Sequence, residues 1–153
     1  MEKVNPLYEL FCIISDYCDK IEEANYNLYK LFSPVSIADI ENWESSHNAK
    51  LPEGYKNWIM LSNGFEMGSS ANIFPLERIF KFPFPECLEL DSSEDYYDIG
   101  DFIGDGSELL SDKNGNFYEL DHYSGLEKTT FEKFLENWVI KCLENDLREI
   151  NDL

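Results

Sequence analysis

The spacing of apolar residues differs between the ends and the middle of this chain, and the difference restricts the folds open to it. Both ends carry apolar residues at intervals of three and four, which is typical of amphipathic helices. The first stripe consists of Leu7, Leu10, Phe11, Ile14, Cys18 and Ile21. The last stripe consists of Phe131, Phe134, Leu135, Trp138, Val139, Cys142 and Leu143. We therefore predict a helix from Asn5 to about Glu23, which Leu28, Leu31 and Phe32 extend after a break to about residue 32, and a second helix closing the chain.

Two shorter helices are predicted between residues 36 and 64. Ser36 and Asp39 form a capping box that starts the first of them. Leu51-Pro52 favours an extended step, because the residue before a proline is excluded from the helical region. A further helix begins at Glu53, and Asn63-Gly64 ends it, since both residue types tolerate the left-handed conformation.

The middle of the chain has the pattern of strands and turns. Short strands are predicted at Ile73 to Leu76 and at Tyr96 to Ile103. Asn114-Gly115 is a strong hairpin signal between strands at 108–112 and 116–122. A capping box of Thr129 and Glu132 then starts the last helix. The order predicts an α+β fold with N-terminal helices, an antiparallel sheet meander and a C-terminal helix. A chain of 153 residues suits one domain spanning 1–153.

The charge of the chain limits its partners. Thirty-one Asp and Glu face twelve Lys and Arg, which gives a net charge of −19. Such a charge opposes contact with nucleic acid and anionic membranes and favours a basic protein. Residues 86–121 hold twelve of the acids and only Lys113 as a base, so this segment alone carries −11. The alternative interpretation is that the acidity only keeps the protein soluble.

The acidic segment is the predicted partner-binding surface. Aromatic side chains among carboxylates anchor and steer a basic protein. Strand alternation directs only one of Tyr96 and Tyr97 outward, and the other is expected in the core. The alternative is a solvated sheet edge whose charges prevent aggregation. The predicted partner-binding residues are Asp91, Glu94, Asp95, Tyr96, Asp98, Asp101, Asp105 and Glu108.

Few residues suggest catalysis or metal binding. The histidines are His47 and His122, and neither belongs to a readable metal or nucleophile motif. The segment from Asp112 resembles a calcium loop but has Phe117 at its sixth position, where glycine is required, and Tyr123 at its twelfth, where glutamate is required. We therefore predict no enzyme activity, no catalytic residues, no metal and no cofactor. A carboxylate-based hydrolase is the weakest alternative.

The location of the protein is predicted from what its sequence does not contain. The four cysteines show no pairing pattern, and the N-terminus has no basic-then-apolar signal. No apolar run approaches the roughly 20 residues that a membrane helix needs. A cytoplasmic location is therefore expected.

A set of short motifs, all in one order, carries a family resemblance. They are Ile37 to Trp43, Leu51 to Trp58, Leu61 to Gly64, Phe74 to Ile79, Ile99 to Asp101, Gly104-Asp105, Asp112 to Tyr118 and Phe131 to Leu135. In this order they resemble the SUKH superfamily, over about residues 36–145. That superfamily includes the yeast cell-wall-assembly regulator and many bacterial immunity proteins.

The resemblance implies an α+β fold that acts through protein–protein interaction, with no defining set of catalytic residues. The leading hypothesis is an immunity protein that neutralises a cognate, basic, nuclease-like toxin by binding it directly. The alternative is an intracellular regulatory or scaffold protein without a toxin partner. The residues that match the family motifs are interpreted as structural, with Trp43, Leu51, Tyr55 and Trp58 packed between helices and sheet.

Overall fold

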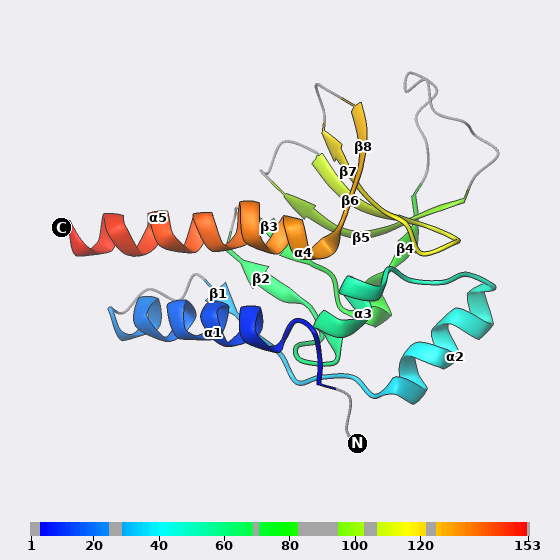
Figure 1. The fold of residues 1–153 in the computed structure, drawn as a ribbon, viewed down its shortest axis with the longest axis horizontal. Coiled ribbons are helices and arrows are strands. Elements are labelled where there is room, and N and C mark those ends of the chain that lie inside the picture. Colours follow the sequence, from blue (N-terminus) through cyan, green and yellow to red (C-terminus); the bar gives the residue numbers. More distant parts are fainter. Residues whose placement is uncertain are drawn as a thin grey trace.

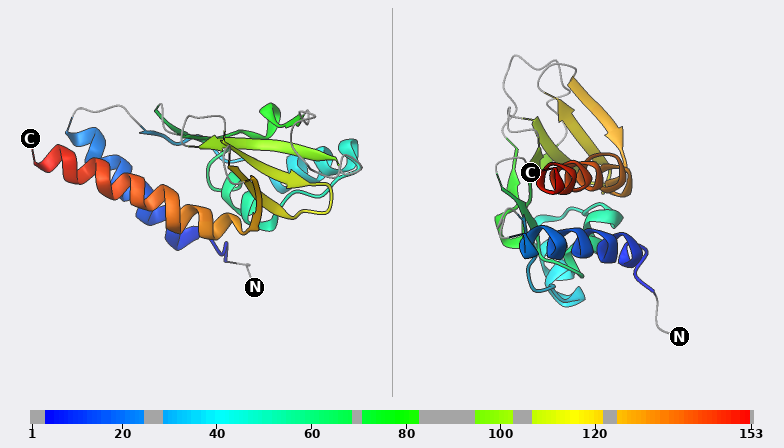
Figure 2. Two further views of the ribbon diagram at one scale, coloured as in Figure 1. Left: turned by 90° about the horizontal axis from the view of Figure 1, so that it is seen from above. Right: turned by 90° about the vertical axis from the view of Figure 1, so that its left-hand side faces the viewer.

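The helices predicted at the two ends of the chain lie side by side (Figures 1 and 2). The computed structural model describes residues 4–24, 29–68, 71–82, 95–102, 107–121 and 125–152. In it, α1 spans Tyr8–Glu23. The closing segment consists of α4 (Phe131–Phe134), the π-helical stretch η2 (Leu135–Val139) and α5 (Ile140–Asn151). α1 and α5 run in the same direction and extend beyond the ends of the strands.

The two short helices begin where their sequences predict. α2 (Ile37–His47) has a complete capping box, in which the Ser36 hydroxyl accepts from the Asp39 N–H and the Asp39 carboxylate accepts from the Ser36 N–H. α3 (Glu53–Ile59) follows the extended Pro52. Gly64 then takes a φ of +102°, which a side chain would strain, as the chain turns toward the sheet.

Eight strands form one antiparallel sheet in the described part of the chain. They are β1 (Tyr29–Lys30), β2 (Phe65–Met67), β3 (Ala71–Ile73), β4 (Phe80–Lys81), β5 (Tyr96–Phe102), β6 (Ser107–Asp112), β7 (Phe117–Asp121) and β8 (Gly125–Thr129). Their spatial order is β1-β2-β3-β5-β6-β7-β8, and β4 pairs with β5 outside this path. A short 3-10 helix, η1 (Leu76–Arg78), connects β3 to β4. The fold is α+β, as predicted.

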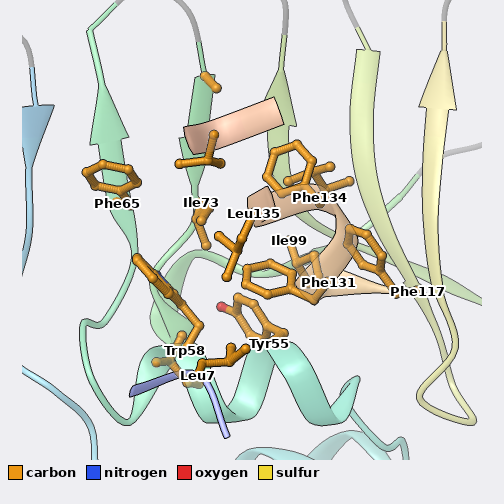
Figure 3. Packing of buried hydrophobic residues seen from close by; sticks show 14 of the residues in the cluster. Leu7, Tyr55, Trp58, Phe65, Ile73, Ile99, Phe117, Phe131, Phe134 and Leu135 are labelled. Atoms are coloured by element: carbon orange, nitrogen blue, oxygen red, sulfur yellow. The ribbon is translucent and has the colours of Figure 1, made fainter. Parts of the chain in front are cut away.

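The main hydrophobic core lies between the helices and one face of the sheet, which we call the inner face (Figure 3). Tyr55 and Trp58 of α3 pack beside Phe131 of α4, and the rings of Tyr55 and Phe131 meet edge to face with centroids 5.9 Å apart. Trp43 of α2 packs edge to face against Tyr97 of β5. Trp43, Leu51, Tyr55 and Trp58 are all buried, which confirms their interpretation as core residues.

The opposite, outer face of the sheet carries a second apolar cluster. Its buried members are Tyr96, Leu110 and Leu120, with Phe82, Tyr118 and Leu126 packed around them. All six belong to strands or directly follow one. Within the described residues, the α-helices therefore contribute no side chain to this cluster.

Several boundaries differ from the sequence predictions. Tyr29–Lys30 is a strand paired with β2, so the helical extension to residue 32 is wrong at its described residues, and Leu28 lies outside them. The last helix is capped by Thr130 instead of Thr129, because Thr129 is the final residue of β8. β3 ends at Ile73, before the predicted strand reaches Leu76. The helices in the described part of the chain are all too short or too polar to span a bilayer.

Candidate protein-binding surface

One line of side chains crosses the outer face from the first strand to the last. Residues directly opposite one another on paired strands project from the same face. The register of the sheet therefore places one continuous series on the outer face, which we call the outer row. It consists of Lys30, Glu66, Asn72, Asp101, Glu108, Leu120 and Leu126.

The middle of the outer row is acidic. Glu66 is exposed between the inward-facing Phe65 and Met67. Asp101 lies directly opposite Glu108 on the neighbouring strand, and like charges in such a pair repel. The Asn72 side-chain amide donates to the Asp101 carboxylate at 3.2 Å. Among the described residues, no basic group forms a salt bridge with Glu66, Asp101 or Glu108. The three carboxyl groups thus lie in one line without a salt bridge among the described residues, although Lys30 is the cross-strand neighbour of Glu66.

Close approach of β3 to β5 makes this row continuous. Gly100 sits directly opposite Ile73, and a Cβ on it would lie 2.5 Å from the Asn72 carbonyl oxygen. Real Cβ atoms do not approach a carbonyl oxygen so closely, so only glycine fits here without moving the strands. The glycine of the Ile99-Gly100 motif therefore holds Asn72 beside Asp101.

A buried carboxyl group, Asp98, lies next to the outer row. The register between β5 and β6 shifts at Ile99. Asp98 is only 1% exposed, and one of its oxygens accepts from the Gly100 N–H at 3.1 Å. Its other oxygen, Oδ2, is buried and has no hydrogen-bond donor among the described residues.

Asp98 and Glu108 share this part of the face and interact directly. Glu108 is two residues from Leu110, the cross-strand partner of Asp98. Burial and the neighbouring Glu108 carboxyl raise the pKa of Asp98 to about 9, and burial also raises the pKa of Glu108. At neutral pH the pair therefore holds a proton.

The predicted partner-binding residues occupy different environments. Asp101 and Glu108 lie in the outer row, as described above. Asp95 is exposed just before β5 and forms a salt bridge with Lys81 at 2.8 Å. Asp91, Glu94 and Asp105 lie outside the described residues.

Tyr96 and Asp98 require a correction, because neither is a free surface side chain. Tyr96 is 7% exposed and meets Tyr118 edge to face, with ring centroids 5.6 Å apart. Both tyrosines of the pair are packed: Tyr97 contacts the inner core and Tyr96 the outer cluster. The alternation was predicted correctly, but the outer face has an apolar cluster of its own that covers Tyr96 and adjoins Asp98.

A pocket of about 460 Å³ adjoins the outer row. Glu66 and Asn72 belong to both. The Asn63 side chain fixes one wall, because its oxygen accepts from the Leu76 N–H and its amide donates to Glu77, both at 2.9 Å. The full lining consists of Phe32, Ser33, Asn63, Glu66, Asn72, Ile73, Pro75, Glu77 and Arg78.

The sequence analysis did not predict the pocket or two members of the outer row, Glu66 and Asn72. Glu66 and Asn72 lie on strands of three residues, too short for a visible alternation. One signal was present: Asn63 and Pro75 belong to the family motifs and both line the pocket.

The architecture is that of an α+β domain. Its α-helices pack on the inner face of the sheet, and the outer row crosses the opposite face. The model of the SMI1 / KNR4 family (SUKH-1) matches residues 34–141, which is most of the chain. The chain belongs to this family. No curated protein and no solved structure was found to match it.

The other chemistry of the described residues is sparse. No group of three or more His, Cys, Asp or Glu side chains in that part of the chain is arranged to hold a metal ion. His47 stacks on Trp43 with ring centroids 4.0 Å apart, and its Nδ1 lies 2.7 Å from the Trp43 carbonyl oxygen. His122 lies outside the described residues. The absence of catalytic activity stays a prediction.

Proposed function

We propose that this protein binds a basic protein partner through the outer row and the adjoining pocket. The observation that carries the proposal is the group of Glu66, Asp101 and Glu108. These carboxyl groups lie in one line on the outer face without a salt-bridge partner among the described residues. The repulsion between the directly opposed Asp101 and Glu108 disfavours the free protein, and a cationic partner relieves it.

The net charge and the pocket support the same kind of partner. A charge of −19 attracts a basic protein over distances longer than any contact. The lining of the pocket includes the apolar side chains of Phe32 and Pro75 and the acidic side chains of Glu66 and Glu77. Interfaces draw most of their affinity from a few side chains inserted into such pockets.

Membership of the family supports an immunity or regulatory role for this binding. In our proposal the partner is a cognate toxin, and the acidic surface covers the basic groove with which a nuclease-like toxin holds its substrate. Nucleic acid binds such grooves through its phosphates, and a row of carboxylates matches the same charges.

Binding to a nuclease-like toxin from a gene neighbouring that of this protein tests the proposal. Glu66→Lys and Asp101→Lys should each weaken the complex by tenfold or more in low salt, as measured by calorimetry. Glu149→Lys on α5 is the matched control, because it makes the same charge change at an exposed position away from the outer row. If all three substitutions leave the affinity of the complex unchanged, the outer row is not part of the interface.

The family match also keeps a second role open. A regulatory scaffold would bind several endogenous proteins with moderate affinity and protect against no toxin. Protection of a toxin-sensitive strain by the wild-type protein decides between the two roles.

A further inference from the structure

The buried carboxyl group of Asp98 has one oxygen without a hydrogen-bond partner among the described residues, and the proposed function does not explain it. Its Oδ2 atom is shielded from water and receives no hydrogen bond from the described donors. Its neighbour Glu108 is another carboxyl group, and burial and that neighbour raise the pKa of Asp98. Burying an acid beside acids costs free energy, which a cation would recover.

The charged and polar groups around Asp98 come from several strands. On β5 and β6 the neighbours are acids, Asp101 and Glu108. Lys81 on β4 is paired with Asp95, and the Tyr118 hydroxyl on β7 donates to Asp112 at 3.1 Å. The residues that the strands place around this position are Asn72 on β3, Phe80 and Lys81 on β4, Asp101 on β5, Glu108 and Asp112 on β6, Tyr118 on β7 and Lys128 on β8.

We propose that an arginine side chain of the partner binds between Asp101 and Glu108, and that its arrival releases the proton held by Asp98 and Glu108. This inference rests on the proposed function and defines the central contact of that interface. Before binding, Asp98 and Glu108 together hold one proton; after binding both are ionised, and that proton passes to solvent.

The geometry favours a guanidinium group over a metal ion. Asp101 and Glu108 are direct cross-strand neighbours, so their carboxylates present two acceptors side by side to a planar fork of N–H donors. One oxygen of Asp101 is already engaged by the Asn72 amide. Within the described residues, the side chains do not form a metal-binding group.

Proton release distinguishes this site from general attraction between opposite charges. A hexa-arginine peptide serves as the probe, and calorimetry in two buffers of different ionisation enthalpy counts the protons released. The wild-type protein should release a substantial fraction of one proton per bound peptide near neutral pH. Its dissociation constant should fall by up to about tenfold per pH unit between about pH 6 and about pH 8.

Asp98→Asn is the decisive variant, because asparagine keeps the shape of the protonated acid but cannot ionise. It should still bind the peptide, with little proton release and a dissociation constant that varies less with pH. Asp101→Asn should weaken binding itself, and a thermal melt confirms that each variant is folded. Equal proton release by wild type and Asp98→Asn would overturn the inference, as would a peptide that binds without perturbing Asp101 and Glu108 in carboxyl-detected NMR.

The outcome is separable from that of the proposed function. Toxin binding with identical pH dependence in wild type and Asp98→Asn would leave the function standing and reject the proton-linked site. Coupled peptide binding without any toxin complex would support the site and reject the function.

Discussion

The Tyr55 hydroxyl donates a hydrogen bond to the Phe74 carbonyl oxygen at 2.6 Å, inside the main core. Tyr55 is fully buried on α3, and Phe74 directly follows β3. The bond therefore connects the third helix to the segment that leads into η1. Since η1 begins two residues later and carries part of the pocket wall, this contact helps to position the pocket.

Tyr55→Phe should lower the free energy of unfolding by about 1–3 kcal/mol, because a buried carbonyl loses its donor. Urea denaturation measures the change. Tyr17→Phe is the control: its hydroxyl makes a long, exposed bond of 3.4 Å to Glu144, so its loss should cost little. Equal effects of the two substitutions would mean that the Tyr55 bond adds nothing to stability.

Asp98→Asn should change how stability depends on pH. The pKa of Asp98 is about 9 in the folded protein and about 4 in an unfolded chain, so the folded state holds the proton more tightly. The free energy of unfolding of the wild type therefore falls as the pH rises from about 4 to about 9, by at most about 1.4 kcal/mol per pH unit. Asparagine does not titrate and removes this pH dependence. The free energy of unfolding of the variant, relative to that of the wild type, should therefore increase as the pH rises. Denaturation at a series of pH values, with the exposed Asp19→Asn as control, checks the sign.

Gly64→Ala should destabilise the protein by more than about 1 kcal/mol, since its φ is +102°. A Cβ there would also lie 2.8 Å from the Ile73 carbonyl oxygen. Gly125→Ala is a matched control, because Gly125 has a φ of +91° but a Cβ on it would meet no atom within 4 Å. The difference between the two variants in thermal denaturation isolates the close contact with β3.

The rate of association with a basic toxin should depend on salt. Attraction between opposite net charges acts before contact, so the association rate constant should fall by roughly tenfold or more from low to high ionic strength. Asp101→Lys should lower the rate constant and weaken its salt dependence more than Glu149→Lys does. Stopped-flow fluorescence measures both, and a rate independent of salt would argue against charge-driven recognition.

The sequence predicted those elements whose signals are local. Ser36 and Asp39 lie three residues apart, so their capping box was readable without a structure, and Asn114-Gly115 fixed the hairpin between β6 and β7. β1 and β2 were not predicted, because strands of two or three residues are too short to show the alternation of apolar and polar residues. Thr129 and Thr130 are chemically alike, and only the pairing of Thr129 with Phe117 in the sheet assigns the cap to Thr130.

The proposed binding surface was only half predictable for the same reason. Asp101 and Glu108 lie in the acidic segment and were found by counting charges. Glu66 and Asn72 lie far from that segment in sequence, and they join the surface through the register of β2, β3 and β5. The burial of Tyr96 depends on Leu110 and Leu120, which reach it from two further strands.

The outer row draws one residue from each of seven strands, from Lys30 near the start of the chain to Leu126 near its end. A nascent or partly folded chain therefore cannot present it. Recognition through this surface would act as a check on completed folding, because a partner would engage only molecules in which β1 and β8 have both joined the sheet. A truncated or misfolded copy would leave that partner unbound.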